Sequence, residues 1–116
     1  IDQIVPYSMS KAAMTSMSKG LASEWGKYGV RVNSLAPGFI MTELTRGLWT
    51  QEHMKSWGKV VTPLQRMGQP GDLIGTAIFL ASQASAFITG QVIRIDGGIT
   101  AGIHWPIAED FKVTET

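Results

Sequence analysis

The sequence lacks cysteine altogether and carries little net charge. Without cysteine, disulfide bonds and thiolate zinc sites are excluded, and the absence fits a reducing compartment, so we expect a cytoplasmic protein. The net charge is +1, and charged residues make up only 16% of the chain. Because this balance creates no strong field of either sign, it gives no reason to expect nucleic acid or an anionic membrane as a partner.

Long hydrophobic runs are also missing. The longest apolar stretches extend over a few residues, so no segment has the length of a transmembrane helix. The first residue is Ile1, and no signal-peptide pattern follows it. The chain has 116 residues, about the length of one small domain, and 44% of them are hydrophobic, which is too many for a disordered segment.

The first part of the chain has helical periodicity. Residues 1–6 are expected to end a loop that closes on Pro6, and residues 8–27 to form a helix that stops at Gly26 and Gly29. The apolar residues of this helix recur mostly at spacings of three and four: Met9, Ala12, Ala13, Met17, Leu21, Ala22 and Trp25.

A strand is predicted directly after this helix. Residues 30–35 are rich in β-branched side chains and alternate in character, and Pro37 and Gly38 end them. A helix, a tight turn and a strand in this order form the second half of a βαβ unit. The sequence therefore predicts an α/β fold.

A second helix and a second strand follow. Thr42 can cap a short helix, residues 62–70 have the prolines and glycine of a loop, and Pro70 opens a longer helix. The apolar face of that helix consists of Leu73, Ile74, Ala77, Ile78, Leu80 and Ala81. Residues 91–96 form the second predicted strand, which a pair of glycines ends.

Tyr7 and Lys11 lie four residues apart at the start of the first helix, a spacing that places both side chains on one face. A phenol ordinarily has a pKa of about 10, which is too high for efficient proton exchange at neutral pH. An ammonium group alongside stabilises the phenolate and lowers that pKa. Such a pair can act as a general acid or base toward an alcohol or a carbonyl group, although the spacing alone is also common by chance.

Five segments in order along the chain resemble motifs of the short-chain dehydrogenase/reductase family, over roughly residues 5–100. The Tyr-Ser-Met-Ser-Lys run resembles that family's YxxxK active-site segment. The segments that carry the resemblance are residues 7–13, 30–38, 39–42, 63–70 together with 77–82, and 88–98.

The resemblance implies the C-terminal part of a Rossmann-like, doubly wound parallel sheet, with residues 1–116 forming the C-terminal portion of a single domain. Residues 39–70 would supply the substrate lid and loop, and residues 99–116 a C-terminal tail. In this family the glycine-rich phosphate loop, the cofactor-selecting residue and the catalytic serine precede the tyrosine, and no G-x-x-x-G-x-G stretch occurs here. We therefore expect a fold that is incomplete and inactive without an N-terminal half, and a separate N-terminal segment in the same particle.

The resemblance also implies site residues. Tyr7 would exchange a proton with the substrate oxygen, and Lys11 would assist it and hydrogen-bond the nicotinamide ribose. Pro37 and Gly38 would lie beside the nicotinamide of NAD or NADP, with the backbone of Ile40 meeting its carboxamide. The remaining cofactor-binding residue would be Thr42, through its hydroxyl and the helix that it opens.

The function that follows is transfer of a hydride between NAD(P) and a secondary alcohol or ketone. The segment that follows Thr42 and the loop over residues 63–70 resemble most the members that act on sugars, sugar acids or polyols, such as gluconate 5-dehydrogenases. A 3-oxoacyl carrier-protein reductase-like enzyme is the alternative within the family. A non-catalytic scaffold chain of the same fold is the alternative that is not an enzyme. Cofactor titration separates this scaffold from the two enzymes.

Three further features have two interpretations each. Trp49 and Trp57 either belong to a substrate lid or pack an ordinary surface helix. The small side chains of the first helix either pack in the core or lie at an interface of a homo-oligomer, a dimer or tetramer. The tail either reaches a neighbouring subunit or covers its own sheet through Ile103, Trp105 and Ile107. No metal site is expected, because His53 has no partner at ligand spacing and His104 is distant.

Overall fold

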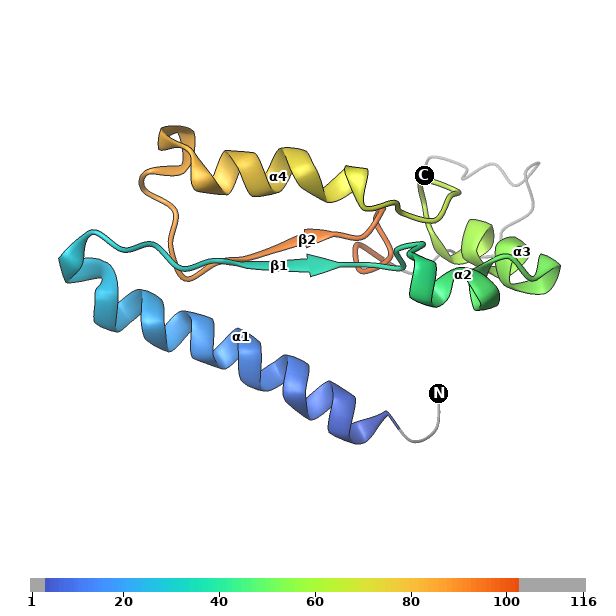
Figure 1. The fold of residues 1–116 in the computed structure, drawn as a ribbon, viewed down its shortest axis with the longest axis horizontal. Coiled ribbons are helices and arrows are strands. Elements are labelled where there is room, and N and C mark those ends of the chain that lie inside the picture. The colour runs from blue at the N-terminus through green and yellow to red at the C-terminus, as the bar shows by residue number, and fades with distance from the viewer. Residues whose placement is uncertain (1–3, 103–116) are drawn as a thin grey trace, which may run out of the picture.

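Two parallel strands form the middle layer of the molecule. The computed structural model describes residues 4–102, and the tail residues Ile103, Trp105 and Ile107 lie outside this range. Strand β1 (Ser34–Pro37) pairs with strand β2 (Val92–Ile95) so that their first residues and their last residues are opposite each other. Helices α1 (Val5–Trp25) and α4 (Gly71–Ala81) lie on opposite faces of the strand pair (Figure 1). This arrangement is the predicted α/β architecture.

Helix α1 begins earlier than the sequence suggests. The loop expected over residues 1–6 was wrong at its end, because Pro6 belongs to the first helical turn. Proline is tolerated there since an N–H in the first turn has no partner within the helix. At the other end, a short 3-10 helix (Gly26–Tyr28) follows α1, and Gly29 closes it with a left-handed φ of 74°. The predicted stop at the glycines is therefore confirmed.

Strand β1 is shifted toward the C-terminus relative to the expected strand over residues 30–35. The Val32 amide donates to the Thr89 hydroxyl (3.0 Å), and the Val32 carbonyl accepts from the Gly90 amide (2.7 Å). The Asn33 side chain bonds the same loop, accepting from the Gln91 amide at 3.0 Å. Residues 31–33 are thus bound to the loop that precedes β2, and regular pairing starts only at Ser34.

Arg31 fastens the end of α4 to the sheet. Its guanidinium donates to the carbonyl groups of Leu80 (2.7 Å), Ser82 (3.3 Å) and Ile88 (3.1 Å). The last carbonyls of a helix have no partner within the helix, so a multidentate donor at this point satisfies them. The contact holds α4 over the strand pair.

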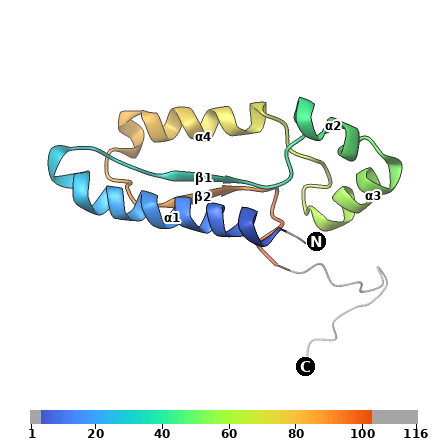
Figure 2. The same cartoon turned by 60° about the horizontal axis from the view of Figure 1, so that its bottom comes forward.

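Two short helices, α2 (Glu43–Trp49) and α3 (Glu52–Val61), lie beyond the carboxyl ends of the strands (Figure 2). The first of them is the helix predicted from Thr42, and the second contains Trp57, for which a substrate lid or an ordinary surface helix was expected. The loop over residues 62–70 returns from α3 to α4 and forms a parallel bridge between Gly68 and Ile40.

Few side chains are deeply buried. Among residues 4–102, Ala22 and Trp49 are the only apolar residues below a tenth exposed. Ile74 and Ile78 of α4 are mostly exposed, as are several methionines of α1. In the described part of the chain, no helix has the length and apolar character to cross a membrane.

Candidate active site

A groove of about 560 Å³ opens beside the N-terminal half of α1, along β1 and the loop that follows it. It lies toward the carboxyl ends of the parallel strands, which is where open α/β sheets bind ligands. All the residues that the sequence assigns to catalysis or cofactor binding line it: Tyr7, Lys11, Pro37, Gly38, Ile40 and Thr42. The fold therefore gathers into one groove residues that are up to 35 positions apart in the sequence, Tyr7 and Thr42 being the outermost.

Tyr7 and Lys11 face each other on consecutive turns of α1. The Lys11 Nζ atom lies 5.2 Å from the centroid of the Tyr7 ring, within the range of a cation–π contact. The Tyr7 side chain is exposed in this chain, at 62%. A phenol and an ammonium group are thus held together at the edge of the groove, where a carbonyl or hydroxyl substrate can reach both.

Gly38 fixes the ends of the two strands against each other. Its amide donates to the Ile95 carbonyl at 3.0 Å, and a Cβ atom at this position would lie 2.7 Å from the Cα of Asp96. No side chain fits so close to a neighbouring backbone. The Pro37–Gly38 turn therefore has a structural requirement for glycine in addition to its expected place beside a cofactor.

Ile40 forms an isolated parallel bridge with Gly68. In the bridge to Gly68, the bonds run from the Met41 amide to the Gly68 carbonyl (2.8 Å) and from the Gly68 amide to the Phe39 carbonyl (2.9 Å). In such a bridge the N–H and C=O groups of Ile40 itself point the other way. Its carbonyl accepts from the Thr45 hydroxyl at 3.0 Å, while its N–H has no partner among the described residues.

Thr42 begins α2 with a reciprocal cap. Its hydroxyl accepts from the Thr45 amide (3.3 Å), and the Thr45 hydroxyl accepts from the Thr42 amide (2.9 Å). This capping box satisfies donors that a helix N-terminus otherwise leaves free. Sequence reasoning found Thr42 but missed Thr45, although its place three residues after the cap was a usable signal. Met14, Thr15 and Leu73 also line the groove without having been predicted.

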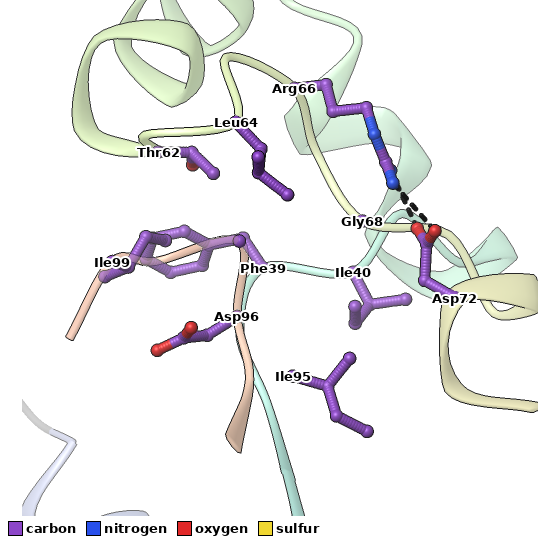
Figure 3. Close-up of a pocket in the computed structure, with 11 residues that line it drawn as sticks. Phe39, Ile40, Thr62, Leu64, Arg66, Gly68, Asp72, Ile95, Asp96 and Ile99 are labelled. Carbon is purple, nitrogen blue, oxygen red and sulfur yellow. Dashed lines mark hydrogen bonds and ion pairs between the residues drawn. The ribbon is translucent and has the colours of Figure 1, made fainter. Parts of the chain in front are cut away.

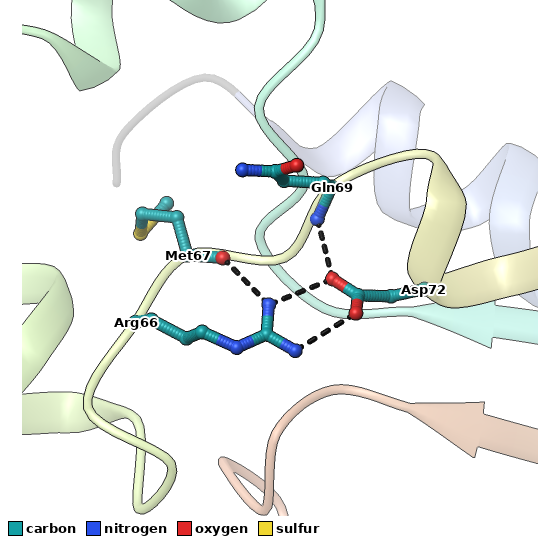
Figure 4. A network of polar contacts seen from close by, with 4 residues as sticks. All are labelled: Arg66, Met67, Gln69 and Asp72. Atoms are coloured by element: carbon teal, nitrogen blue, oxygen red, sulfur yellow. Dashed lines mark hydrogen bonds and ion pairs between the residues drawn. The ribbon is translucent and has the colours of Figure 1, made fainter.

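The loop before α4 is held by a charged network (Figure 4). The Arg66 guanidinium donates two hydrogen bonds to the Asp72 carboxylate, at 2.7 and 2.8 Å, and one to the Met67 carbonyl. The Gln69 amide donates to the same carboxylate at 2.7 Å. The Arg66 hydrogen bonds, followed by the Gln69 amide, hold the pKa of Asp72 at about 2, below its ordinary value.

A second carboxylate organises the loop after β2. Asp96 accepts from the Thr100 hydroxyl (2.6 Å), the Gly98 amide (2.9 Å) and the Thr100 amide (3.1 Å). The Thr100 hydroxyl, followed by the Gly98 amide, lowers the pKa of Asp96. These three hydrogen bonds of the Asp96 carboxylate hold together the loop that packs against Gly38.

A second cavity, of about 180 Å³, lies on the far side of the Ile40 segment (Figure 3). Its walls are mainly apolar, and Ile40 lines both this cavity and the groove. The Thr62 hydroxyl is buried at its margin without a hydrogen-bond partner in the described chain. Residues 4–102 contain no cluster of three or more histidine, cysteine, aspartate or glutamate side chains that could hold a metal.

A family model described as "Enoyl-(Acyl carrier protein) reductase" matches residues 1–100, most of the chain. The chain belongs to the short-chain dehydrogenase/reductase family. This membership confirms the resemblance read from the five sequence segments. The short-chain dehydrogenase/reductase match covers every residue that lines the groove.

Two family relatives illustrate the similarity in sequence. A gluconate 5-dehydrogenase of Gluconobacter oxydans (strain 621H) is 44% identical over 100 residues, covering 86% of this chain and 39% of the relative. A galactitol 2-dehydrogenase (L-tagatose-forming) of Cereibacter sphaeroides is 39% identical over 94 residues, covering 81% of this chain and 37% of the relative. The chain therefore spans well under half the length of these short-chain dehydrogenases.

A solved structure illustrates the similarity in fold. The gluconate 5-dehydrogenase of Burkholderia cenocepacia J2315, crystallised in complex with NADP and tartrate, matches with a TM-score of 0.81 and 42% identity. The match covers 85% of this chain and 39% of that one. The expected architecture, part of a Rossmann-like parallel sheet, is confirmed by this agreement.

Proposed function

We propose that the protein containing this sequence is an NAD(P)-dependent oxidoreductase. It transfers a hydride between the nicotinamide and a secondary alcohol or ketone, and its substrate is a sugar acid, sugar or polyol. The observation that supports this proposal best is the convergence of Tyr7, Lys11, Ile40 and Thr42 on one groove at the carboxyl ends of the strands. Since the chain spans about 40% of its relatives, the activity is assigned to the assembled fold.

The groove fits the nicotinamide riboside end of the cofactor. The Ile40 N–H suits the carboxamide oxygen, the Lys11 ammonium suits the ribose hydroxyls, and the Thr42 hydroxyl lies at the same wall. When bound, the nicotinamide supplies or accepts the hydride. We assign the binding of the cofactor's pyrophosphate and adenosine to the part of the fold that the longer relatives have and that this chain does not span.

Tyr7 is the proposed acid and base. In reduction its phenol donates a proton to the carbonyl oxygen of the substrate, and in oxidation the phenolate takes the proton from the hydroxyl group. Lys11, 5.2 Å from the ring, stabilises the phenolate electrostatically. The rest of the fold would exclude water from this pair, which strengthens both effects.

The substrate class is supported by the relatives, a gluconate 5-dehydrogenase and a galactitol dehydrogenase among them. We further propose that residues 39–70 form the substrate lid and loop, because α2 and α3 lie at the carboxyl ends of the strands beside the groove. Reduction of the 3-oxo group of a 3-oxoacyl chain on a carrier protein is the second candidate. The description of the matched family model, an enoyl-(acyl carrier protein) reductase, supports the carrier-protein substrate class.

Turnover of the assembled protein tests the proposal. Oxidation of NADPH or NADH is followed with 5-ketogluconate, with the ketose L-tagatose and with a 3-oxoacyl thioester. Tyr7→Phe should lower turnover about 10²- to 10⁴-fold while cofactor affinity changes little, since only the proton transfer is removed. Undiminished turnover in Tyr7→Phe contradicts the role of Tyr7, and a lack of NAD(P)(H) binding by the assembled protein favours a scaffold.

Assembly into a homodimer or homotetramer in the cytoplasm completes the proposal. It is supported by the apolar side chains that remain exposed on two helices, among them Met9 and Met17 of α1 and Ile74 and Ile78 of α4. Faces of this kind are covered in a folded protein by other elements or by other subunits. Light scattering of the assembled protein measures the subunit number, and a monomer at micromolar concentration would contradict it.

A further inference from the structure

Three aromatic side chains form a cluster beside the groove. The Phe39 ring lies 5.2 Å from the Trp49 ring and 5.2 Å from the Trp57 ring, at tilted angles of 52° and 56°. The two indoles are 6.3 Å apart and nearly parallel, with an interplanar angle of 5°. These are favourable geometries for aromatic pairs, so the three rings hold one another in fixed orientations.

The cluster joins elements with different proposed tasks. Phe39 is the residue before Ile40, which lines the groove. Trp49 ends α2, and Trp57 lies in the middle of α3. Both helices of the proposed lid are therefore packed on the same short segment that faces the nicotinamide.

The other ties between the lid and this segment are few and local. The Thr45 hydroxyl bonds the Ile40 carbonyl at 3.0 Å, and Gly58 of α3 lies against the side chain of Met67. The aromatic cluster is the contact that engages α2 and α3 together. Helices α2 and α3 lie beyond the ends of the strands, away from the layers formed by the strands, α1 and α4 (Figure 1). Loss of the cluster would therefore affect the lid before it affects the sheet.

We infer that Phe39, Trp49 and Trp57 are positioning residues that set the lid against the nicotinamide end of the groove, so that substrate and cofactor affinity depend on the same cluster. This inference rests on the proposed function. A looser lid would leave the Tyr7–Lys11 pair intact. It would have to become ordered whenever substrate or cofactor binds, and the free energy spent on that ordering would weaken binding. Loss of the cluster is therefore expected to raise the substrate KM and weaken cofactor affinity, with little change in kcat.

A matched pair of variants tests this. Trp57 is 43% exposed and Trp25, at the C-terminal end of α1 and away from the groove, is 42% exposed. In the assembled protein, Trp57→Leu should raise the substrate KM and the cofactor dissociation constant about threefold to tenfold, the range for loss of aromatic pairing. The kcat should stay within about twofold, and Trp25→Leu should leave all three quantities unchanged. Trp57→Phe, which keeps a ring, should restore most of the affinity.

Unchanged KM and cofactor affinity in Trp57→Leu would overturn the inference, even if its melting temperature falls, because that pattern belongs to a purely structural role. A fall in kcat alone would also overturn it. Cofactor affinity is measured by titration without turnover, so it decides the inference even if the wild-type protein reduces none of the substrates. In that case the proposed function fails separately.

Discussion

Gly38 shows how the absence of one side chain fixes the geometry of the groove. The Gly38 backbone passes Asp96 so closely that a Cβ atom would lie 2.7 Å from its Cα and 2.8 Å from its Cβ. Backbone atoms cannot move aside as the end of a flexible side chain can. The requirement for glycine at this turn therefore comes from the packing of two strand ends that are distant in sequence.

We expect Gly38→Ala to destabilise the assembled protein by about 1–3 kcal/mol, because the ends of β1 and β2 must separate to admit the methyl group. Gly47→Ala is the matched control. Gly47 lies inside α2 with open space around it, so alanine should stabilise by up to about 1 kcal/mol through helix propensity. Chemical denaturation measures both, and equal effects at the two sites would contradict the close contact.

Asp72 makes the stability of the loop before α4 dependent on pH. Because its pKa in the folded protein is about 2, below that of an unfolded aspartate, its contribution is present above the unfolded value of about 4. That contribution is lost as the pH falls toward 2. In Asp72→Asn, stability should be lower at neutral pH and should decline less steeply across this range.

Acid denaturation of the two proteins measures the difference. Glu52→Gln serves as control, because Glu52 and Lys55 form an exposed pair at 4.0 Å whose contribution should be slight. Parallel acid curves for wild type and Asp72→Asn would contradict the assignment of the pH dependence to the Arg66–Asp72 network.

Among the elements, α2 depends on a cap that its sequence displays only in part. Thr45 bonds the Thr42 amide and the Ile40 carbonyl, so it starts the helix and ties it to the groove wall. We expect Thr45→Val to cost about 1–2 kcal/mol. Thr50→Val, which removes only a bond to the Arg46 carbonyl at the exposed end of α2, should cost less than about 0.5 kcal/mol.

Hydrogen exchange reports the same change locally. The amide of Thr42 should lose protection in Thr45→Val and keep it in Thr50→Val. If both variants leave that amide protected, the capping box does not control the start of α2.

Element boundaries show where local sequence signals were sufficient. Gly29 at a left-handed φ and Pro70 at the start of α4 act through their own backbone preferences, so the positions of these breaks were predictable. The start of β1 was not, because Val32 and Asn33 bond the loop before β2 rather than a strand. That choice depends on a segment more than fifty residues later in the sequence.

At the scale of the molecule, the chain buries few apolar side chains. Ala22 and Trp49 are the deeply buried ones in residues 4–102, while α4 exposes Ile74 and Ile78. Apolar burial is the main favourable term in folding, so residues 4–102 have little to offset the loss of their chain entropy. The exposed faces require covering elements or subunits.

We therefore expect the 116-residue chain alone to bind an apolar dye, to self-associate and to show no saturable binding of NADP(H). Joined with the segments that complete the fold in its relatives, it should bind the cofactor and lose the dye signal. Dye fluorescence, light scattering and cofactor titration measure these properties. Tight cofactor binding by the 116 residues alone would contradict this expectation.

The sequence by itself determined the family and the order of the elements. Tyr7 and Lys11 share a helix face because α-helices repeat every 3.6 residues, and Thr42 caps α2 because its hydroxyl meets a nearby amide. Only the tertiary structure decided that Gly38 must lack a side chain, that Ile40 bridges Gly68 and that Phe39 joins two tryptophans. These facts depend on contacts between distant segments, which no local pattern of residues encodes.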